Sequence, residues 1–121
     1  IEQARRTNDY KADWVVEKIK NKALQFEKDN GRIPTIACMG LAFKPDIDDL
    51  RESPALYIVR KLCKDISIKA VEPNIEYCED IDLVSLEAGL DMDICVYLVA
   101  HSQFKGLDIK EGDLVFCGGI E

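Results

Sequence analysis

The segment from Gly40 to Ala55 holds the residues best suited to bind an anionic ligand. Gly40 allows the backbone to turn sharply and to approach a ligand closely. Lys44 is a compact cation suited to a phosphate oxygen. Arg51 comes just before a predicted helix start, where the backbone N–H groups also favour anions. These residue types at this spacing therefore indicate a phosphate or diphosphate contact.

Composition alone favours a plainer interpretation of the same segment. Lys44 and Arg51 could form surface ion pairs on a solvated polar loop, and no G-x-G-x-x-G dinucleotide pattern occurs in it. Asp48, Asp49 and Glu52 could be read as a metal site. We prefer to read them as acids near a helix start, where they favour the helix dipole and orient Arg51. We therefore expect no metal here.

Two further residues could take part in chemistry. Glu72 ends a predicted strand, where dinucleotide folds place an acid that binds ribose. Because no glycine fingerprint precedes it, a structural turn is the preferred interpretation. His101 is the only histidine, and we interpret it as a structural residue or a subtype marker rather than a general base.

The five cysteines fit neither a disulfide framework nor a zinc site, because their number is odd and no C-x-x-C pair occurs. We expect buried, reduced thiols in a cytosolic protein. The net charge of −7 argues against nucleic acid as a partner. No apolar run approaches the roughly 20 residues of a membrane span, and no signal segment opens the chain, so the default location is the cytoplasm.

The strands and helices that the sequence predicts must position these residues. Residues 1–30 predict one long amphipathic helix, stopped at Asn30-Gly31. Residues 31–121 then predict an α/β domain in which Ser53 caps a helix that begins at Pro54. Strands are expected at 35–39, 66–71, 94–99 and 114–117, and helices at 54–64, 85–89 and 102–106. Near-continuous apolar strands separated by helices indicate a Rossmann-like parallel sheet with helices on both faces.

The Gly40–Ala55 segment resembles the signature that opens the C-terminal domain of the UDP-glucose/GDP-mannose dehydrogenase family. Three other segments extend the resemblance over essentially the whole chain. Ala4–Asp9 is similar to the end of the long helix that links the two halves of these enzymes, and Val71–Asn74 resembles a strand-end Asp/Glu-Pro turn. Ala100–Lys105 is similar to the version in UDP-N-acetyl-mannosamine dehydrogenases, whereas UDP-glucose enzymes more often carry Thr-Glu-Trp there.

The resemblance implies part of an enzyme that oxidises C6 of a UDP-sugar to a carboxylate with two NAD molecules. It implies that Phe43 and Lys44 contact the nucleotide-sugar substrate and that Arg51 reaches NAD across the cleft between domains. The NAD-binding domain, the central helical domain with its dimer interface, and the nucleophilic cysteine belong to the rest of such an enzyme. We therefore expect no catalytic residue in this chain, no activity of the chain alone, and a homodimer for the complete protein.

Three alternatives remain open: a UDP-glucose 6-dehydrogenase, a more distant GDP-mannose enzyme, and a free-standing nucleotide-binding or regulatory module. The opening at Ile1, without a Met or a cap, leads us to expect a missing N-terminal part and so argues against the free-standing module. The chain departs from the family at Gly118-Gly119, where a basic residue often helps to bind the nucleotide. No role is assigned to that end.

Overall fold

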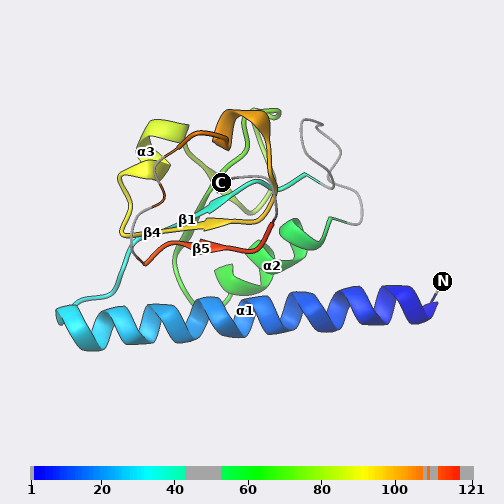
Figure 1. The fold of residues 1–121 in the computed structure, drawn as a ribbon, viewed down its shortest axis with the longest axis horizontal. Helices are drawn as coiled ribbons and strands as arrows, with labels where there is room; N and C mark the ends of the chain where they lie inside the picture. Colours follow the sequence, from blue (N-terminus) through cyan, green and yellow to red (C-terminus); the bar gives the residue numbers. More distant parts are fainter. Residues whose placement is uncertain (1, 43–52, 108, 110–111, 118–121) are drawn as a thin grey trace.

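The computed structural model describes residues 2–42, 53–107, 109 and 112–117, with residues 2–11 described through their backbone alone. A long helix comes first, followed by alternating strands and helices (Figure 1). The elements are α1 (Glu2–Asn30), β1 (Ile36–Met39), α2 (Pro54–Cys63), β2 (Ile68–Val71), β3 (Asp82–Leu83), α3 (Leu86–Leu90), β4 (Ile94–Tyr97), the 3-10 helix η1 (Ser102–Phe104) and β5 (Leu114–Val115).

The described strands form a parallel sheet in the order β3-β2-β1-β4-β5. The central strand β1 pairs on both sides, so that Ile36 lies opposite Ile68 of β2 and Ile94 of β4. From β1 the chain first builds the sheet outward through β2 and β3, and then returns to build it through β4 and β5. This order places a topological switch point between β1 and β4, as in doubly wound nucleotide-binding folds. The predicted Rossmann-like fold is confirmed.

Both faces of the sheet are covered, because alternate residues of each strand point to opposite sides. Ile36 and Cys38 of β1 pack with the cluster beneath α1 and α2, whereas Ala37 and Met39 pack with the cluster beside α3 and η1. Figure 1 shows α1 and α2 on one side of the sheet and α3 on the other.

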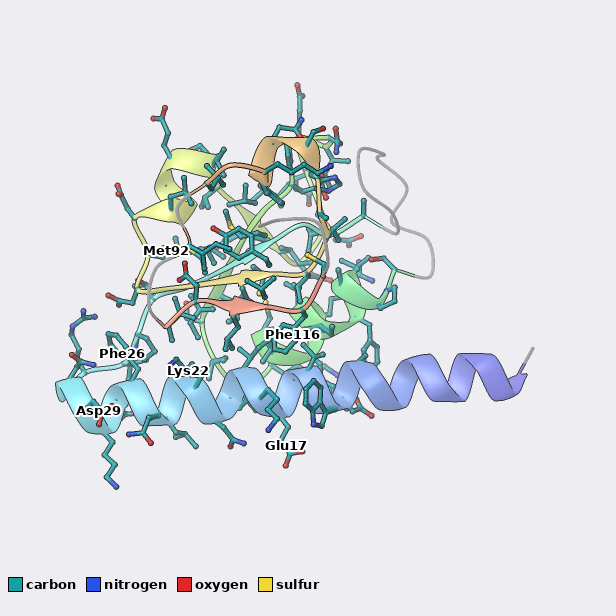
Figure 2. The ribbon with its side chains drawn as sticks, in the orientation of Figure 1. Glu17, Lys22, Phe26, Asp29, Met92 and Phe116 are labelled. Atoms are coloured by element: carbon teal, nitrogen blue, oxygen red, sulfur yellow. The ribbon has the colours of Figure 1, made fainter. Side chains whose placement is uncertain are left out.

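The predicted first helix is confirmed, with its amphipathic pattern realised in packing. Val15, Val16 and Ile19 are buried, while Glu17 points away from the sheet and Phe116 lies between the sheet and α1 (Figure 2). Trp14 packs edge-on against Phe116, with the ring centroids 6.2 Å apart, and is 47% exposed. The helix ends as expected, because Gly31 has a positive φ of 71° and donates to the Glu27 carbonyl at 2.8 Å.

The edge strand β3 is absent from the expected elements. It has two residues, neither of them buried, and forms only where Asp82 lies opposite Lys69 of β2. The ion pair between the Lys69 ammonium and the Asp82 carboxylate spans 2.6 Å at this pairing. So short an exposed strand carries no apolar run that would predict it.

Cys38, Cys78 and Cys95 are buried as expected, whereas Cys63 and Cys117 are only partly buried, so the expectation of buried thiols is wrong for these two. Burial raises the pKa of the Cys38 thiol well above its usual range. Among the described residues, no helix combines the length with the apolar character that a membrane span requires.

Candidate functional site

The carboxyl ends of the three central strands are tied together by backbone hydrogen bonds. The Gly40 N–H donates to the Val71 carbonyl at 2.8 Å, which joins the end of β1 to β2. The N–H groups of Leu98 and Val99 donate to the Met39 carbonyl at 3.0 and 3.3 Å, which joins the end of β4 to β1. Ligands of open α/β sheets bind at this edge, next to the switch point. It is therefore the candidate functional site.

Gly40 makes the close approach at this edge possible. Its φ is +102°, a conformation that L side chains rarely adopt. A Cβ atom at this position would lie 2.6 Å from the Cβ of Val99. The predicted sharp turn after the first strand is confirmed, and its partner is a residue that follows β4.

Glu72, at the end of β2, directs its carboxylate into the turn that follows Gly40. Its Oε1 accepts from the N–H groups of Leu41 and Ala42 at 2.8 and 3.0 Å. Its Oε2 accepts from the Asn74 N–H at 3.0 Å. The residue is only 4% exposed, and its side chain is fully buried. These contacts support the structural interpretation of Glu72 over a ribose-binding role.

His101 completes the same network from the chain that follows β4. Its Nε2 donates to Glu72 Oε1 at 2.8 Å, and its Nδ1 lies 3.3 Å from the amide nitrogen of Asn74. The ring is 0% exposed and packs edge-on against Phe104. The geometry thus supports a structural role and not that of a general base.

Ser53 holds the other end of the segment that follows the turn. Its hydroxyl donates to the Leu41 carbonyl at 2.6 Å and accepts from the Leu56 N–H at 3.2 Å, which caps α2. The predicted N-cap and the proline at the first helical position are therefore confirmed. Leu41 is held on both sides, through its N–H by Glu72 and through its carbonyl by Ser53.

The residues that we expected to contact ligands, Phe43, Lys44 and Arg51, lie outside the described residues, as do Asp48, Asp49 and Glu52. The structure describes the residues on either side of them, Ala42 and Ser53, and both belong to the network at the sheet edge. The contacts of Asn74 and of the turn's N–H groups with Glu72 were not predicted from the sequence. The Val71–Asn74 motif was a signal for a turn, but it carried no sign of the direction of its side chains.

An apolar hollow of about 220 Å³ lies beside this edge, between α1 and α2. Its lining consists of Ala12, Val15, Pro54, Ala55, Ile58, Leu98 and Phe116. None of the described residues that line it is charged, so this part of the hollow does not suit a phosphate. In the parts of the chain that the structure describes, no Asp, Glu, His and Cys side chains gather in a group of three or more that could hold a metal ion.

Comparison with known proteins gives consistent matches. Residues 37–116 match the model of the UDP-glucose/GDP-mannose dehydrogenase family, UDP binding domain. The UDP-N-acetyl-D-mannosamine dehydrogenase of Campylobacter jejuni is 44% identical over 97% of this chain and 30% of its own length. The NDP-N-acetyl-D-galactosaminuronic acid dehydrogenase of Ralstonia nicotianae is 41% identical over 89% of this chain and 26% of its own length.

Among solved structures, the UDP-N-acetyl-mannosamine dehydrogenase Cap5O of Staphylococcus aureus is similar to this chain, with a TM-score of 0.67 and 29% identity. That match covers 79% of this chain and 22% of the solved chain. This chain therefore spans less than a third of the length of each of these three relatives.

Proposed function

This chain belongs to the UDP-glucose/GDP-mannose dehydrogenase family, as its UDP-binding domain, and from that membership we propose that it serves an NAD-dependent UDP-N-acetyl-mannosamine 6-dehydrogenase. Its task is to bind the UDP half of the substrate, whose C6 alcohol becomes a carboxylate while two NAD molecules are reduced. The observation that carries the proposal is the anchored sheet edge, where Glu72 and Ser53 hold the two sides of the segment that bears Lys44 and Arg51.

In this proposal the segment between Ala42 and Ser53 supplies the ligand contacts. Phe43 and Lys44 contact the nucleotide-sugar, where the lysine makes a charge-assisted contact with the diphosphate. Arg51 contacts NAD, because a guanidinium can meet a pyrophosphate with two parallel hydrogen bonds. Because both ends of this segment are held by hydrogen bonds, less of its backbone must be ordered when the ligand binds, which favours such contacts.

The rest of a longer enzyme supplies NAD binding, the central helical domain and the nucleophilic cysteine. The raised pKa values of thiols in this chain support placing the nucleophilic cysteine elsewhere, because a thiolate and not a thiol is the nucleophile. Burial raises the pKa of the thiols of Cys38, Cys63 and Cys117. We further propose that the complete enzyme is a homodimer in the cytoplasm, where reducing conditions suit the five free cysteines.

The relatives from Campylobacter jejuni and Ralstonia nicotianae support an amino sugar over glucose, since both of their names specify N-acetylated sugars. The test measures NADH formed by the full-length protein that contains this chain, with UDP-N-acetyl-mannosamine and, separately, with UDP-glucose. Oxidation of an alcohol to an acid removes four electrons, so we expect two NADH per molecule of the amino sugar and little turnover of UDP-glucose. Turnover of UDP-glucose alone would contradict the choice of substrate, and no NADH from either sugar would contradict the proposed activity.

A further inference from the structure

The first strand–helix turn of this sheet already holds an anion, and that anion belongs to the protein. In dinucleotide-binding folds, the backbone N–H groups of this turn bind the pyrophosphate of the ligand. Here the N–H groups of Leu41 and Ala42, which directly follow Gly40, donate to the carboxylate of Glu72. Two of the donors that such a fold offers to a phosphate are therefore occupied from within.

The position of Glu72 in the fold is one that binds a ligand in related architectures. It directly follows β2, the strand whose end carries the ribose-binding acid in dinucleotide folds. Its side chain turns inward and is fully buried, so it offers no surface to a ribose. The same position thus serves the neighbouring turn instead of an external ligand.

The carboxylate is fully provided with donors. Oε1 accepts from two backbone N–H groups and from His101 Nε2, and Oε2 accepts from the Asn74 N–H. A buried carboxylate is tolerated only with such partners. Because the donors come from the chain after β1, β2 and β4, the one carboxylate connects the three central strand ends.

We propose that Glu72 is an internal substitute for a nucleotide phosphate at this turn and a positioning residue for the nucleotide-sugar site. It holds Leu41 and Ala42 in the conformation from which Phe43 and Lys44 follow. One consequence arises: neither a phosphate of the substrate nor a dinucleotide can use the N–H groups of Leu41 and Ala42, because Glu72 already occupies them. The substrate in this inference rests on the proposed function, whereas the role of the carboxylate as an anion at the turn does not.

The test uses Glu72→Ala in the full-length protein, because this change removes a fragment equivalent to acetate. We expect the Michaelis constant for the nucleotide-sugar to rise about tenfold or more, as for loss of a charged hydrogen-bond partner. The Michaelis constant for NAD should rise by a smaller factor, because Arg51 stands two residues before Ser53, at the end of the segment that Ser53 and not Glu72 holds. Added acetate should return the Michaelis constant for the nucleotide-sugar towards its wild-type value in a saturable manner. Acetamide, a neutral molecule of the same shape, should not.

Glu79→Ala removes an exposed glutamate from the same stretch of chain and serves as the matched control, with no effect of acetate expected. If Glu72→Ala does not fold, Glu72→Gln keeps an acceptor oxygen and shape but removes the charge, and the substrate constant should still rise. An unchanged substrate constant in a folded variant, or equal rescue by acetate and acetamide, would overturn the inference.

A separate readout keeps this inference apart from the proposed function. If the wild-type protein turns over no nucleotide-sugar, the proposed activity fails, but the melting temperature of Glu72→Ala still reports on the anion. Acetate should then raise that temperature and acetamide should not. Equal effects of acetate and acetamide on the melting temperature would overturn the inference that Glu72 serves as an anion at this turn.

Discussion

Glu72 and His101 lie 29 residues apart in the chain and meet at 2.8 Å, with both side chains fully buried. The pair joins the end of β2 to the end of β4, on either side of the central strand β1. The same Glu72 oxygen accepts from the turn that follows β1. This arrangement makes the carboxyl edge of the sheet one connected unit.

His101→Phe should lower the free energy of unfolding by about 2–3 kcal/mol, because it leaves a buried carboxylate with one donor fewer. His101→Gln should lose only about 1 kcal/mol, since its amide can still donate to Glu72. Urea unfolding of the two variants measures the difference. A larger loss for His101→Gln than for His101→Phe would show that the ring is needed for its packing against Phe104 and not for its hydrogen bond.

Gly40→Ala should destabilise the protein by about 2–4 kcal/mol, because strain at positive φ adds to a collision with Val99. Gly31→Ala is the matched control. Gly31 also has a positive φ, but a Cβ atom there would meet nothing within 4 Å, so a loss of about 1 kcal/mol is expected. Chemical unfolding of the two variants separates the cost of the collision with Val99 from the cost of backbone strain at positive φ. A Gly40 variant no less stable than the Gly31 variant would contradict the close approach.

Ser53→Ala should cost about 2–3 kcal/mol of stability, because it removes the cap of α2 and also leaves the Leu41 carbonyl without its donor. Ser85→Ala removes a cap of the same kind, from an exposed serine at the start of α3. That loss should be about 0.5–1 kcal/mol. Thermal unfolding of the pair tests whether Ser53 does more than cap a helix, and similar losses would argue that it does not.

The free energy of unfolding should fall at low pH because the Asp93 carboxylate becomes protonated. Asp93 joins the turn after α1 to the start of β4. Its carboxylate accepts from both terminal nitrogens of Arg32 and from the backbone and hydroxyl of Thr35. The hydrogen bonds from Arg32, followed by those from Thr35, hold the pKa of Asp93 far below its usual range. A lowered pKa in the folded state stabilises the protein above the pKa of the unfolded chain, about 3.9, and this contribution is lost as the pH falls below it.

The measurement for Asp93 is the free energy of unfolding between about pH 6 and pH 2. Asp93→Asn should lower stability at the upper end of this range and flatten the decline at the lower end. Asp91→Asn, a change of an exposed acid two residues earlier, should leave the decline as steep as in the wild type. An Asp93→Asn curve parallel to that of the wild type would contradict the assignment.

The proposed contacts of Lys44 with the nucleotide-sugar and of Arg51 with NAD should separate in steady-state kinetics of the full-length protein. Lys44→Ala should raise the Michaelis constant for the nucleotide-sugar by about tenfold, and Arg51→Ala should raise that for NAD by a similar factor, as expected for charge-assisted contacts. Each variant is the control for the other. If Lys44→Ala left the substrate constant unchanged, or Arg51→Ala that for NAD, the corresponding assignment would be wrong.

Much of the fold was accessible from local patterns in the sequence. The helical spacing of apolar residues predicted α1, and Ser53-Pro54 predicted the start of α2. The apolar runs predicted four of the strands, whereas the exposed edge strand β3 had no such run. It exists because Asp82 and Leu83 pair with β2, and pairing depends on a partner distant in the chain.

By itself, the sequence determined the Rossmann-like order of elements and the turn at Gly40, because each depends on local chemistry and spacing. Its resemblance to a dehydrogenase family indicated the membership that the family match shows. Only the tertiary structure decided the use of Glu72. A carboxylate at a strand end can face a ligand or the protein, and its direction depends on donors that lie elsewhere in the chain. The fold brings the N–H groups after Gly40 and the ring of His101 to the end of β2, and these donors turn the carboxylate inward.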